Sequence, residues 1–126
     1  MTFRCPECST PGWMRITQTI ELPPDSRSDE IMLQIVKCER CRFEAVAVYE
    51  ESRRGGLDDE SVDHRGYYVS ESDLKIVKDK VSQCPNPQNG RCRCRVHKQL
   101  GSRDKSGRWD GLAGIELGQR FVMKIR

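Results

Sequence analysis

The amino-acid sequence predicts a small, β-rich α+β fold. Its first half contains segments in which apolar and polar residues alternate, which is the pattern of half-buried strands. Its second half contains one segment whose apolar residues recur every three or four positions, as in an amphipathic helix. Only 36% of the 126 residues are hydrophobic, and seven residues are cysteines. Because this composition supplies a thin core, we expect the cysteines to reinforce it.

Three strands are expected, over residues 13–22, 30–37 and 43–51. The prolines and small polar residues at 23–28 cannot continue a strand, so they separate the first two strands as a turn. Three antiparallel strands are the simplest arrangement. Period-two spacing in the first strand predicts that four apolar residues share one face: Met14, Ile16, Ile20 and Leu22.

A helix is expected over residues 70–83. Ser70, with Asp73 three residues later, resembles a capping box at its start, and Pro85 lies beyond its end. Its buried face is predicted from Leu74, Val77 and Val81. A last strand is predicted from the alternation of Phe121, Met123 and Ile125.

The segment between the strands and the helix has a different composition. Residues 52–66 contain a Gly-Gly pair and four acids, and they are expected to form an acidic linker or loop. The chain is thereby divided into an N-terminal part at residues 1–51, this linker, and a C-terminal part at residues 67–126. We expect the two parts to pack on each other as one compact unit.

The cysteines of the N-terminal part form two Cys-x2-Cys pairs, CPEC and CERC, with 29 residues between them. Each pair can form a tight turn that presents two thiolates to one tetrahedral zinc ion. When the intervening strands close as a hairpin, the two turns come together. The first predicted zinc site therefore consists of Cys5, Cys8, Cys38 and Cys41, which we call the first cysteine group.

These residues resemble the zinc ribbons, which are small domains of transcription factors, RNA polymerase subunits, ribosomal proteins and many bacterial proteins. The resemblance covers roughly residues 3–50 and implies a three-stranded zinc ribbon with the four cysteines as ligands. Two features depart from the pattern. The gap of 29 residues is longer than in many ribbons, and Arg42 stands where a glycine often follows the last cysteine. Zinc ribbons serve so many functions that the resemblance implies a fold and a metal, and little else.

The other three cysteines lie with His97 in the stretch CPNPQNGRCRCRVH. Cys92 and Cys94 are two positions apart, so in an extended segment both thiols point to one face. A turn after Val96 would return His97 to that face, and Cys84 arrives from the end of the helix. Three thiolates and one imidazole complete a second structural zinc site, which we call the second cysteine group. The expected cofactor is thus Zn²⁺, two ions per chain.

Other interpretations of the two groups stay open. Either Cys-x2-Cys pair could be a redox motif, but that motif needs a helix that starts at the cysteines. An iron–sulfur cluster or free thiols could replace zinc in the second cysteine group, and His64 could replace His97 if its loop folds back. An enzyme is a distant alternative, because four protein ligands per site leave no open metal position. No small-molecule substrate is evident from the sequence.

The charges are unevenly distributed along the chain. Residues 1–83 contain 12 Lys+Arg and 16 Asp+Glu, whereas residues 84–126 contain 10 and 3. If the segment around Cys92 and Cys94 is extended, the thiols face one side and the interleaved arginines face the other. A surface that binds RNA or DNA is predicted there, with an indole available for stacking. This basic surface consists of Arg91, Arg93, Arg95, Lys98, Arg103, Lys105, Arg108 and Trp109.

Two interpretations compete with nucleic-acid binding. The arginines could balance the negative charge of the zinc–thiolate groups, because similar cations flank the first cysteine group. The chain could instead be a protein-interaction adaptor that uses its acidic loop and its C-terminal tail. Neither a secretory signal nor a membrane-spanning run is visible, so we expect no membrane partner. We expect a cytoplasmic location, where the cysteines stay reduced.

Overall fold

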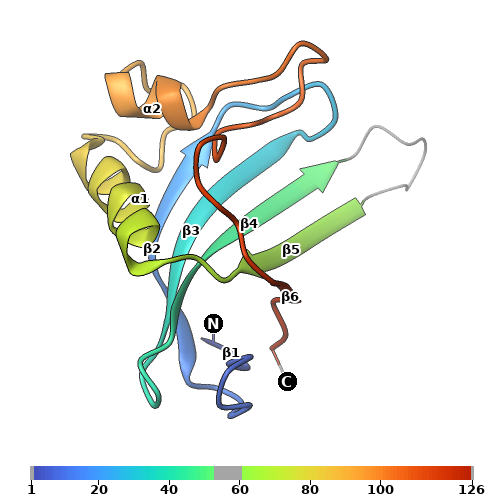
Figure 1. Ribbon diagram of the computed structural model, residues 1–126. Helices are drawn as coiled ribbons and strands as arrows, with labels where there is room; N and C mark the ends of the chain where they lie inside the picture. The colour runs from blue at the N-terminus through green and yellow to red at the C-terminus, as the bar shows by residue number, and fades with distance from the viewer. Residues whose placement is uncertain (1, 53–60, 126) are drawn as a thin grey trace.

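The computed structural model of the chain describes residues 2–52 and 61–125. The strands are β1 (Thr2–Phe3), β2 (Met14–Leu22), β3 (Glu30–Cys38), β4 (Glu44–Ser52), β5 (Ser61–Tyr67) and β6 (Arg120–Val122). The helices are α1 (Glu71–Gln83) and α2 (Arg95–Leu100). One antiparallel sheet carries both helices on the same face (Figure 1). The small, β-rich class predicted from the sequence is therefore confirmed.

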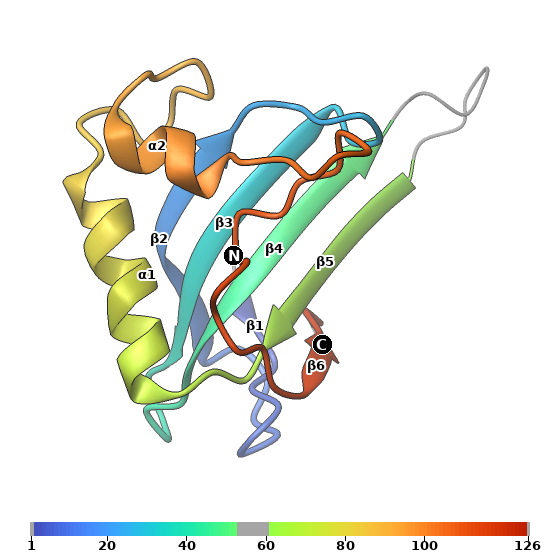
Figure 2. The same cartoon turned by 45° about the horizontal axis from the view of Figure 1, so that its top comes forward.

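The six described strands are neighbours in chain order, and each pairs antiparallel with the next. β2, β3 and β4 are the three antiparallel strands expected from the sequence. The sheet curls into a half-barrel (Figure 2). At one end of the curl the two edges of the sheet meet. There the backbone N–H of Arg4 donates to the carbonyl of Lys124 at 2.6 Å. The residues that follow β1 and β6 therefore meet.

The outer face of the curl is covered by α1, α2 and the segment after them (Figures 1 and 2). α1 begins as predicted, because the side chain of Ser70 accepts the N–H of Asp73 at 3.2 Å. The strands contribute alternate residues to this outer core: Ile20, Leu22, Ile31, Leu33, Ile35, Val46 and Val48. The helix contributes the three residues predicted for its buried face: Leu74, Val77 and Val81.

The inner face of the curl carries a second apolar cluster, at the end where the two edges meet. Ala45 and Ala47 belong to it, and they alternate along β4 with residues of the outer core. Phe3 beside β2 and Met123 beside β5 close the cluster from the two edges. Its buried members are Phe3, Cys5, Met14, Val36, Cys38, Ala45, Ala47 and Met123.

A β-bulge in β2 determines which residues face each core. Ile16 and Gln18 lie opposite consecutive residues of β3, so β2 has one extra residue between them. This extra residue reverses the alternation: Met14 and Ile16 pack with the inner cluster, whereas Ile20 and Leu22 pack in the outer core. The prediction that these four residues share one face is wrong for this reason.

β5 lies mostly in the segment that was expected to form a linker or loop. It occupies residues 61–66 of the linker expected at 52–66, and residues 53–60 lie outside the described part. The strand is polar and therefore lacks an alternating apolar pattern. Arg65, for example, forms an ion pair with Glu50 of β4 at 3.1 Å, where an apolar contact would be typical. β1 and α2 were not predicted either, since two and six residues are too few to show a period.

The C-terminal strand is shorter than its alternating pattern suggests. β6 spans three residues, and Phe121 and Met123 pack against the inner cluster. Ile125, the third apolar residue of the pattern, lies beyond the strand and is 54% exposed.

Asp25, in the turn between β2 and β3, fastens the segment that follows α2. Its Oδ2 accepts the Nη1–H of Arg108 and the backbone N–H of Trp109, both at 2.7 Å. Its Oδ1 accepts the backbone N–H groups of Arg27 and Ser28, at 2.8 and 2.6 Å. Burial alone would raise the pKa of Asp25, but these N–H groups and the Arg108 charge together lower it below its ordinary value.

Asp25→Ala is expected to lower the free energy of unfolding by about 1–3 kcal/mol, because buried N–H groups lose their acceptor. The folded-state pKa of Asp25 lies below the unfolded value of about 3.9. Its contribution to stability is therefore present above that pH and is lost as the pH falls through the folded-state pKa. Urea unfolding at neutral and acidic pH measures this effect, and the gap between wild type and variant should narrow in acid.

Asp79→Ala serves as the control, because Asp79 forms an exposed pair with Lys75 one helical turn away. Its removal should cost only about 0.3–0.5 kcal/mol. A gap between wild type and Asp25→Ala that stays constant down to strongly acidic pH would contradict the prediction.

Candidate metal centres

Two turns of the same conformation carry the first cysteine group. In one turn the N–H of Ser9 donates to the carbonyl of Cys5 at 2.9 Å, and in the other the N–H of Arg42 donates to the carbonyl of Cys38 at 2.8 Å. In addition, the N–H of Cys5 donates to the carbonyl of Thr10 at 3.2 Å, and the N–H of Cys38 donates to the carbonyl of Phe43 at 2.8 Å. One turn follows β1 and the other connects β3 to β4. The two Cys-x2-Cys pairs therefore fold alike.

The residue after each pair adopts a left-handed backbone conformation. The φ angle is 59° at Ser9 and 67° at Arg42, and these are the non-glycine residues with positive φ in the described part of the chain. Glycine adopts this conformation without steric cost, whereas a side chain strains it. Arg42, the departure from the zinc-ribbon pattern, therefore keeps the conformation of the turn and carries its strain.

The four sulfurs of the first cysteine group converge. All of them lie within 4.8 Å of one another. The Sγ atoms of Cys5 and Cys41 are 3.5 Å apart, and those of Cys8 and Cys38 are 3.8 Å apart. Tetrahedral Zn–S bonds of about 2.3 Å place sulfurs about 3.8 Å apart. The first cysteine group therefore has the dimensions of a metal site, and it lies against the inner cluster through the buried Cys5 and Cys38.

The local environment gives the thiols of the first cysteine group different pKa values. Burial raises the pKa of Cys5 to about 12. Hydrogen bonds with Thr10 lower the pKa of Cys8 to about 6. Burial also raises the pKa of Cys41. Since a metal ligand must be a thiolate, a cation has to displace protons from the buried thiols, and metal uptake will release protons.

The second cysteine group is assembled by the two helices. Cys84 follows the last residue of α1, and Cys94 precedes the first residue of α2. The Sγ of Cys84 lies 3.7 Å from that of Cys92 and 3.2 Å from Nδ1 of His97. The four ligand atoms of this group also lie within 4.8 Å of one another. The predicted partners are therefore brought together, at the end of the sheet opposite to the first cysteine group (Figure 1).

α2 positions His97 in a way that the sequence did not indicate. The Sγ of Cys94 caps the helix by accepting the N–H of His97 at 3.4 Å. One helical turn, rather than the bend expected after Val96, directs the imidazole toward the thiols. His97 is 1% exposed, and its Nε2 is buried without a hydrogen-bond partner among the described residues. Nδ1 is thus the ring nitrogen that faces the site.

Burial and hydrogen bonding also give the thiols of the second cysteine group different pKa values. Burial raises the pKa of Cys84 to about 11. The backbone N–H of Cys94 lowers the pKa of Cys92. A cation bound here would therefore also displace a proton from a buried thiol.

His64 is not part of either group. It lies on β5, where its Nε2 is 2.7 Å from Oε1 of Gln34. Its ring makes edge contacts with Phe3 and Tyr49, with centroids 5.3 and 5.5 Å away. These contacts give His64 a place inside the curl of the sheet, so the alternative that it replaces His97 is wrong.

The basic surface expected from the sequence divides into two parts. Six of its cations are exposed: Arg91, Arg93, Arg95, Lys98, Arg103 and Lys105. Arg108 instead pairs with Asp25 at 2.7 Å, and the indole N–H of Trp109 donates to the carbonyl of Leu100 at 2.6 Å. Trp109 also packs against the outer core. The side chains of these two residues are therefore engaged in contacts within the fold, although the backbone of Trp109 is paired with that of Arg103.

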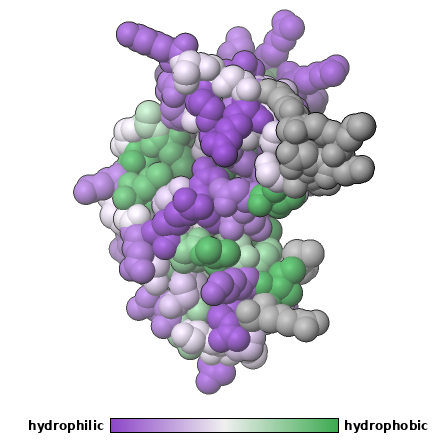
Figure 3. All heavy atoms as spheres, turned by 90° about the vertical axis from the view of Figure 1, so that its right-hand side faces the viewer, coloured by the Kyte–Doolittle hydropathy of each residue, from purple (hydrophilic) through white to green (hydrophobic). Residues whose placement is uncertain are grey.

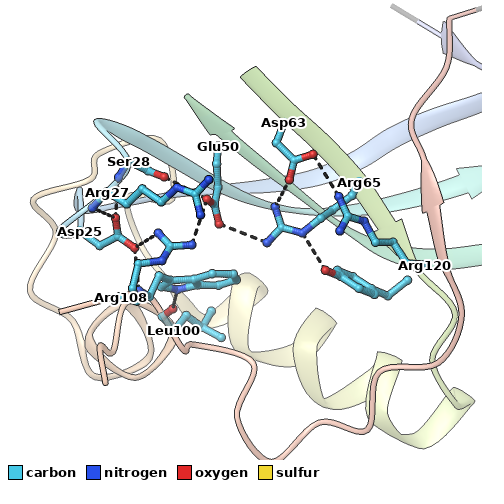
Figure 4. Close-up of polar contacts among 11 residues, drawn as sticks. Asp25, Arg27, Ser28, Glu50, Asp63, Arg65, Leu100, Arg108 and Arg120 are labelled. Atoms are coloured by element: carbon cyan, nitrogen blue, oxygen red, sulfur yellow. Dashed lines mark hydrogen bonds and ion pairs between the residues drawn. The ribbon is translucent and has the colours of Figure 1, made fainter. Parts of the chain in front are cut away.

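The structure also contains a polar cavity of about 450 Å³ that the sequence did not indicate. Arginines from four separate parts of the chain line it, together with Glu50 and Asp63 (Figure 4). The arginines are Arg27, Arg65, Arg108 and Arg120. The sequence does not group them, because consecutive members of the set are 12 to 43 residues apart and two of them lie in the acidic segment 1–83.

Comparison of the chain with protein-family models, with curated proteins and with solved structures finds no significant match. Neither helix of the described residues combines the length and the apolar character that crossing a lipid bilayer requires.

Arg42→Gly is expected to raise the free energy of unfolding by about 0.5–1 kcal/mol. The left-handed conformation costs a side chain about 1–2 kcal/mol, and this gain exceeds the added chain entropy of glycine, about 0.5–1 kcal/mol. Thermal unfolding of the protein as isolated measures the change. Arg40→Gly is the control, because Arg40 lies in the same turn and its φ is not positive. The control should be destabilised, and an equal loss in both variants would contradict the prediction.

Proposed function

We propose that the protein is a non-catalytic zinc-binding protein in which each cysteine group holds one structural Zn²⁺. The observation that carries this proposal is the convergence of two complete sets of four ligand atoms, each within 4.8 Å. Thiolate and imidazole are the ligands that zinc prefers in structural sites. Four protein ligands leave no position for substrate or activated water. The matching turns of the first cysteine group support the zinc-ribbon interpretation of the N-terminal part.

Both proposed ions would connect separate elements of the fold. The first would link the residues after β1 to the turn between β3 and β4. The second would link the end of α1 to α2, which has six residues and would be marginal by itself. Metal binding and folding are coupled in such sites. This role requires reduced thiols, so we propose a reducing compartment such as the cytoplasm.

Protein prepared without added metal is expected to contain two zinc ions per chain, as measured by elemental analysis. His97→Ala should retain one ion, because it removes a ligand of the second cysteine group alone. His64→Ala is the matched control and should retain both. Iron in the preparation, or a single zinc ion in the wild type, would contradict the assignment of the second cysteine group.

We further propose that the exposed part of the basic surface binds RNA or DNA. Within the described residues, none of the side chains of Arg91, Arg93, Arg95 and Lys98 has a carboxylate or hydrogen-bond partner. A zinc ion with three thiolates and one imidazole carries a formal charge of about −1. Four unpaired cations exceed what this charge requires, so local charge balance does not account for them all. Arginine and lysine free of protein partners are suited to phosphate contacts.

The triple variant Arg91→Ala, Arg93→Ala and Arg95→Ala is expected to weaken nucleic-acid binding strongly. Each lost phosphate contact should reduce the slope of log affinity against log salt by about 0.7–0.9. Fluorescence anisotropy with single-stranded RNA and duplex DNA over a range of salt concentrations measures the slope. A control triple variant, Arg15→Ala, Arg40→Ala and Lys124→Ala, removes exposed cations at the opposite end of the sheet. Equal losses in the two triple variants, or no salt-dependent binding by the wild type, would favour a protein-interaction adaptor instead.

A further inference from the structure

The polar cavity lined by four arginines, here called the arginine cavity, has the size of a ligand site. Its volume of about 450 Å³ lies within the range of roughly 300–1,000 Å³ that is typical of small-molecule pockets. Arg27 comes from the turn before β3, Arg65 from β5, Arg108 from the segment after α2 and Arg120 from β6 (Figure 4). Four elements thus direct guanidinium groups toward one space.

Two of these arginines are held in place by carboxylates. Arg65 is 14% exposed and donates to Glu50 at 3.1 Å and to the hydroxyl of Tyr67 at 2.7 Å. Arg108 is 31% exposed and contacts Asp25 at 2.7 Å and Glu50 at 3.4 Å. Glu50 is itself buried and also accepts a hydrogen bond from Ser28. This network gives the cavity a rigid wall with fixed charges.

The other two arginines are available to a ligand. The side chain of Arg27 has no partner among the described residues, and it is exposed. Arg120 is 57% exposed, and its contact with Asp63 is 3.3 Å long. Fold stability alone explains Arg65 and Arg108, but it does not explain why two more arginines face the same cavity.

The charge of the cavity favours an anion. Four arginines line it, and three carboxylates neutralise them: Glu50 and Asp63 in the wall and Asp25 behind Arg108. One positive charge therefore remains uncompensated. Arginine forks bind phosphate and carboxylate oxygens with two parallel hydrogen bonds, and phosphate offers more such oxygens. Arg27 and Arg120 are the two cavity arginines that buried carboxylates do not hold, so they are the ones that a phosphate monoester would contact.

An apolar cavity of about 280 Å³ adjoins the arginine cavity. The two share Glu50, Arg65, Tyr67 and Arg108 in their walls. The apolar cavity is further lined by the partly buried ring of Trp109, whose orientation is fixed by its hydrogen bond to the carbonyl of Leu100. Figure 3 views the molecule from the side that lies on the right in Figure 1, and this face carries hydrophilic surface beside apolar patches.

We propose that the two cavities together bind a nucleoside monophosphate. The phosphate lies between Arg27 and Arg120, and the planar base lies against Trp109 in the apolar cavity. Glu50, at the junction of the two cavities, accepts a hydrogen bond from a ribose hydroxyl there. A second phosphate would approach this carboxylate, so one phosphate fits better than several. This site is separate from both cysteine groups and from the exposed cations of the basic surface.

Isothermal titration calorimetry with adenosine monophosphate, adenosine and inorganic phosphate tests this proposal. Adenosine monophosphate is expected to bind at least about tenfold more tightly than either fragment, because only the whole ligand fills both cavities. In a Trp13→Phe background, in which Trp109 is the remaining tryptophan, adenosine monophosphate should change the indole fluorescence and phosphate should not. Absence of binding at millimolar adenosine monophosphate, or equal binding of inorganic phosphate, would overturn the proposal.

Arg27→Ala and Arg120→Ala should each weaken binding by about tenfold or more, the usual effect of losing a charge-assisted hydrogen bond. Both variants should fold, because Arg27 has no protein partner and Asp63 retains Arg65 when Arg120 is removed. The triple variant of Arg91, Arg93 and Arg95 should bind adenosine monophosphate as the wild type does. This control separates the cavity from the nucleic-acid surface, so either proposal can fail without the other. Unchanged affinity in Arg27→Ala and Arg120→Ala would sink the assignment.

Discussion

The β-bulge between Ile16 and Gln18 controls how the two faces of the sheet are used. A strand with unbroken alternation would direct all its apolar residues toward the helices. The extra residue in β2 instead directs Met14 and Ile16 to the inner face. An apolar cluster therefore forms inside the curl, and the buried Cys5 and Cys38 pack against it. A chain with a thin supply of apolar residues thereby gains two small cores from one sheet.

The two cysteine groups lie where these cores end. The first is attached to the inner cluster through Cys5 and Cys38, and the second closes the outer core through Cys84, which packs with its residues. Burying the thiols raises the pKa of Cys5 and of Cys84, so the buried sulfurs resist ionisation while protons are their only partners. A divalent cation would remove this resistance and join the segments that carry the sulfurs. The proposed zinc ions would thereby stabilise the ends of both apolar cores.

Sequence reasoning succeeded where a pattern was local. The spacing within CPEC and CERC identified the first group, and the leftover cysteines with His97 identified the second. Ser70 correctly indicated the start of α1. Sequence reasoning failed where a structural feature depends on residues elsewhere in the chain. The bulge depends on the register with β3, and the polar β5 depends on ion pairs with β4. Neither feature has a periodic signal of its own.

The same distinction applies to the charges. Arg108 looked like part of the basic surface because six other cations precede it from Arg91 onward, but its partner is Asp25, 83 residues earlier. Arg120 likewise contacts Asp63 of the acidic half. Folding thus pairs some basic residues of the last third with acids of the first two thirds. Among the described residues, several cations have no carboxylate partner; those of residues 91–105 lie close together in the sequence, and Arg27 lines the arginine cavity. An unpaired surface cation contributes little to stability, so the grouping of these residues is consistent with the anion contacts that we propose for them.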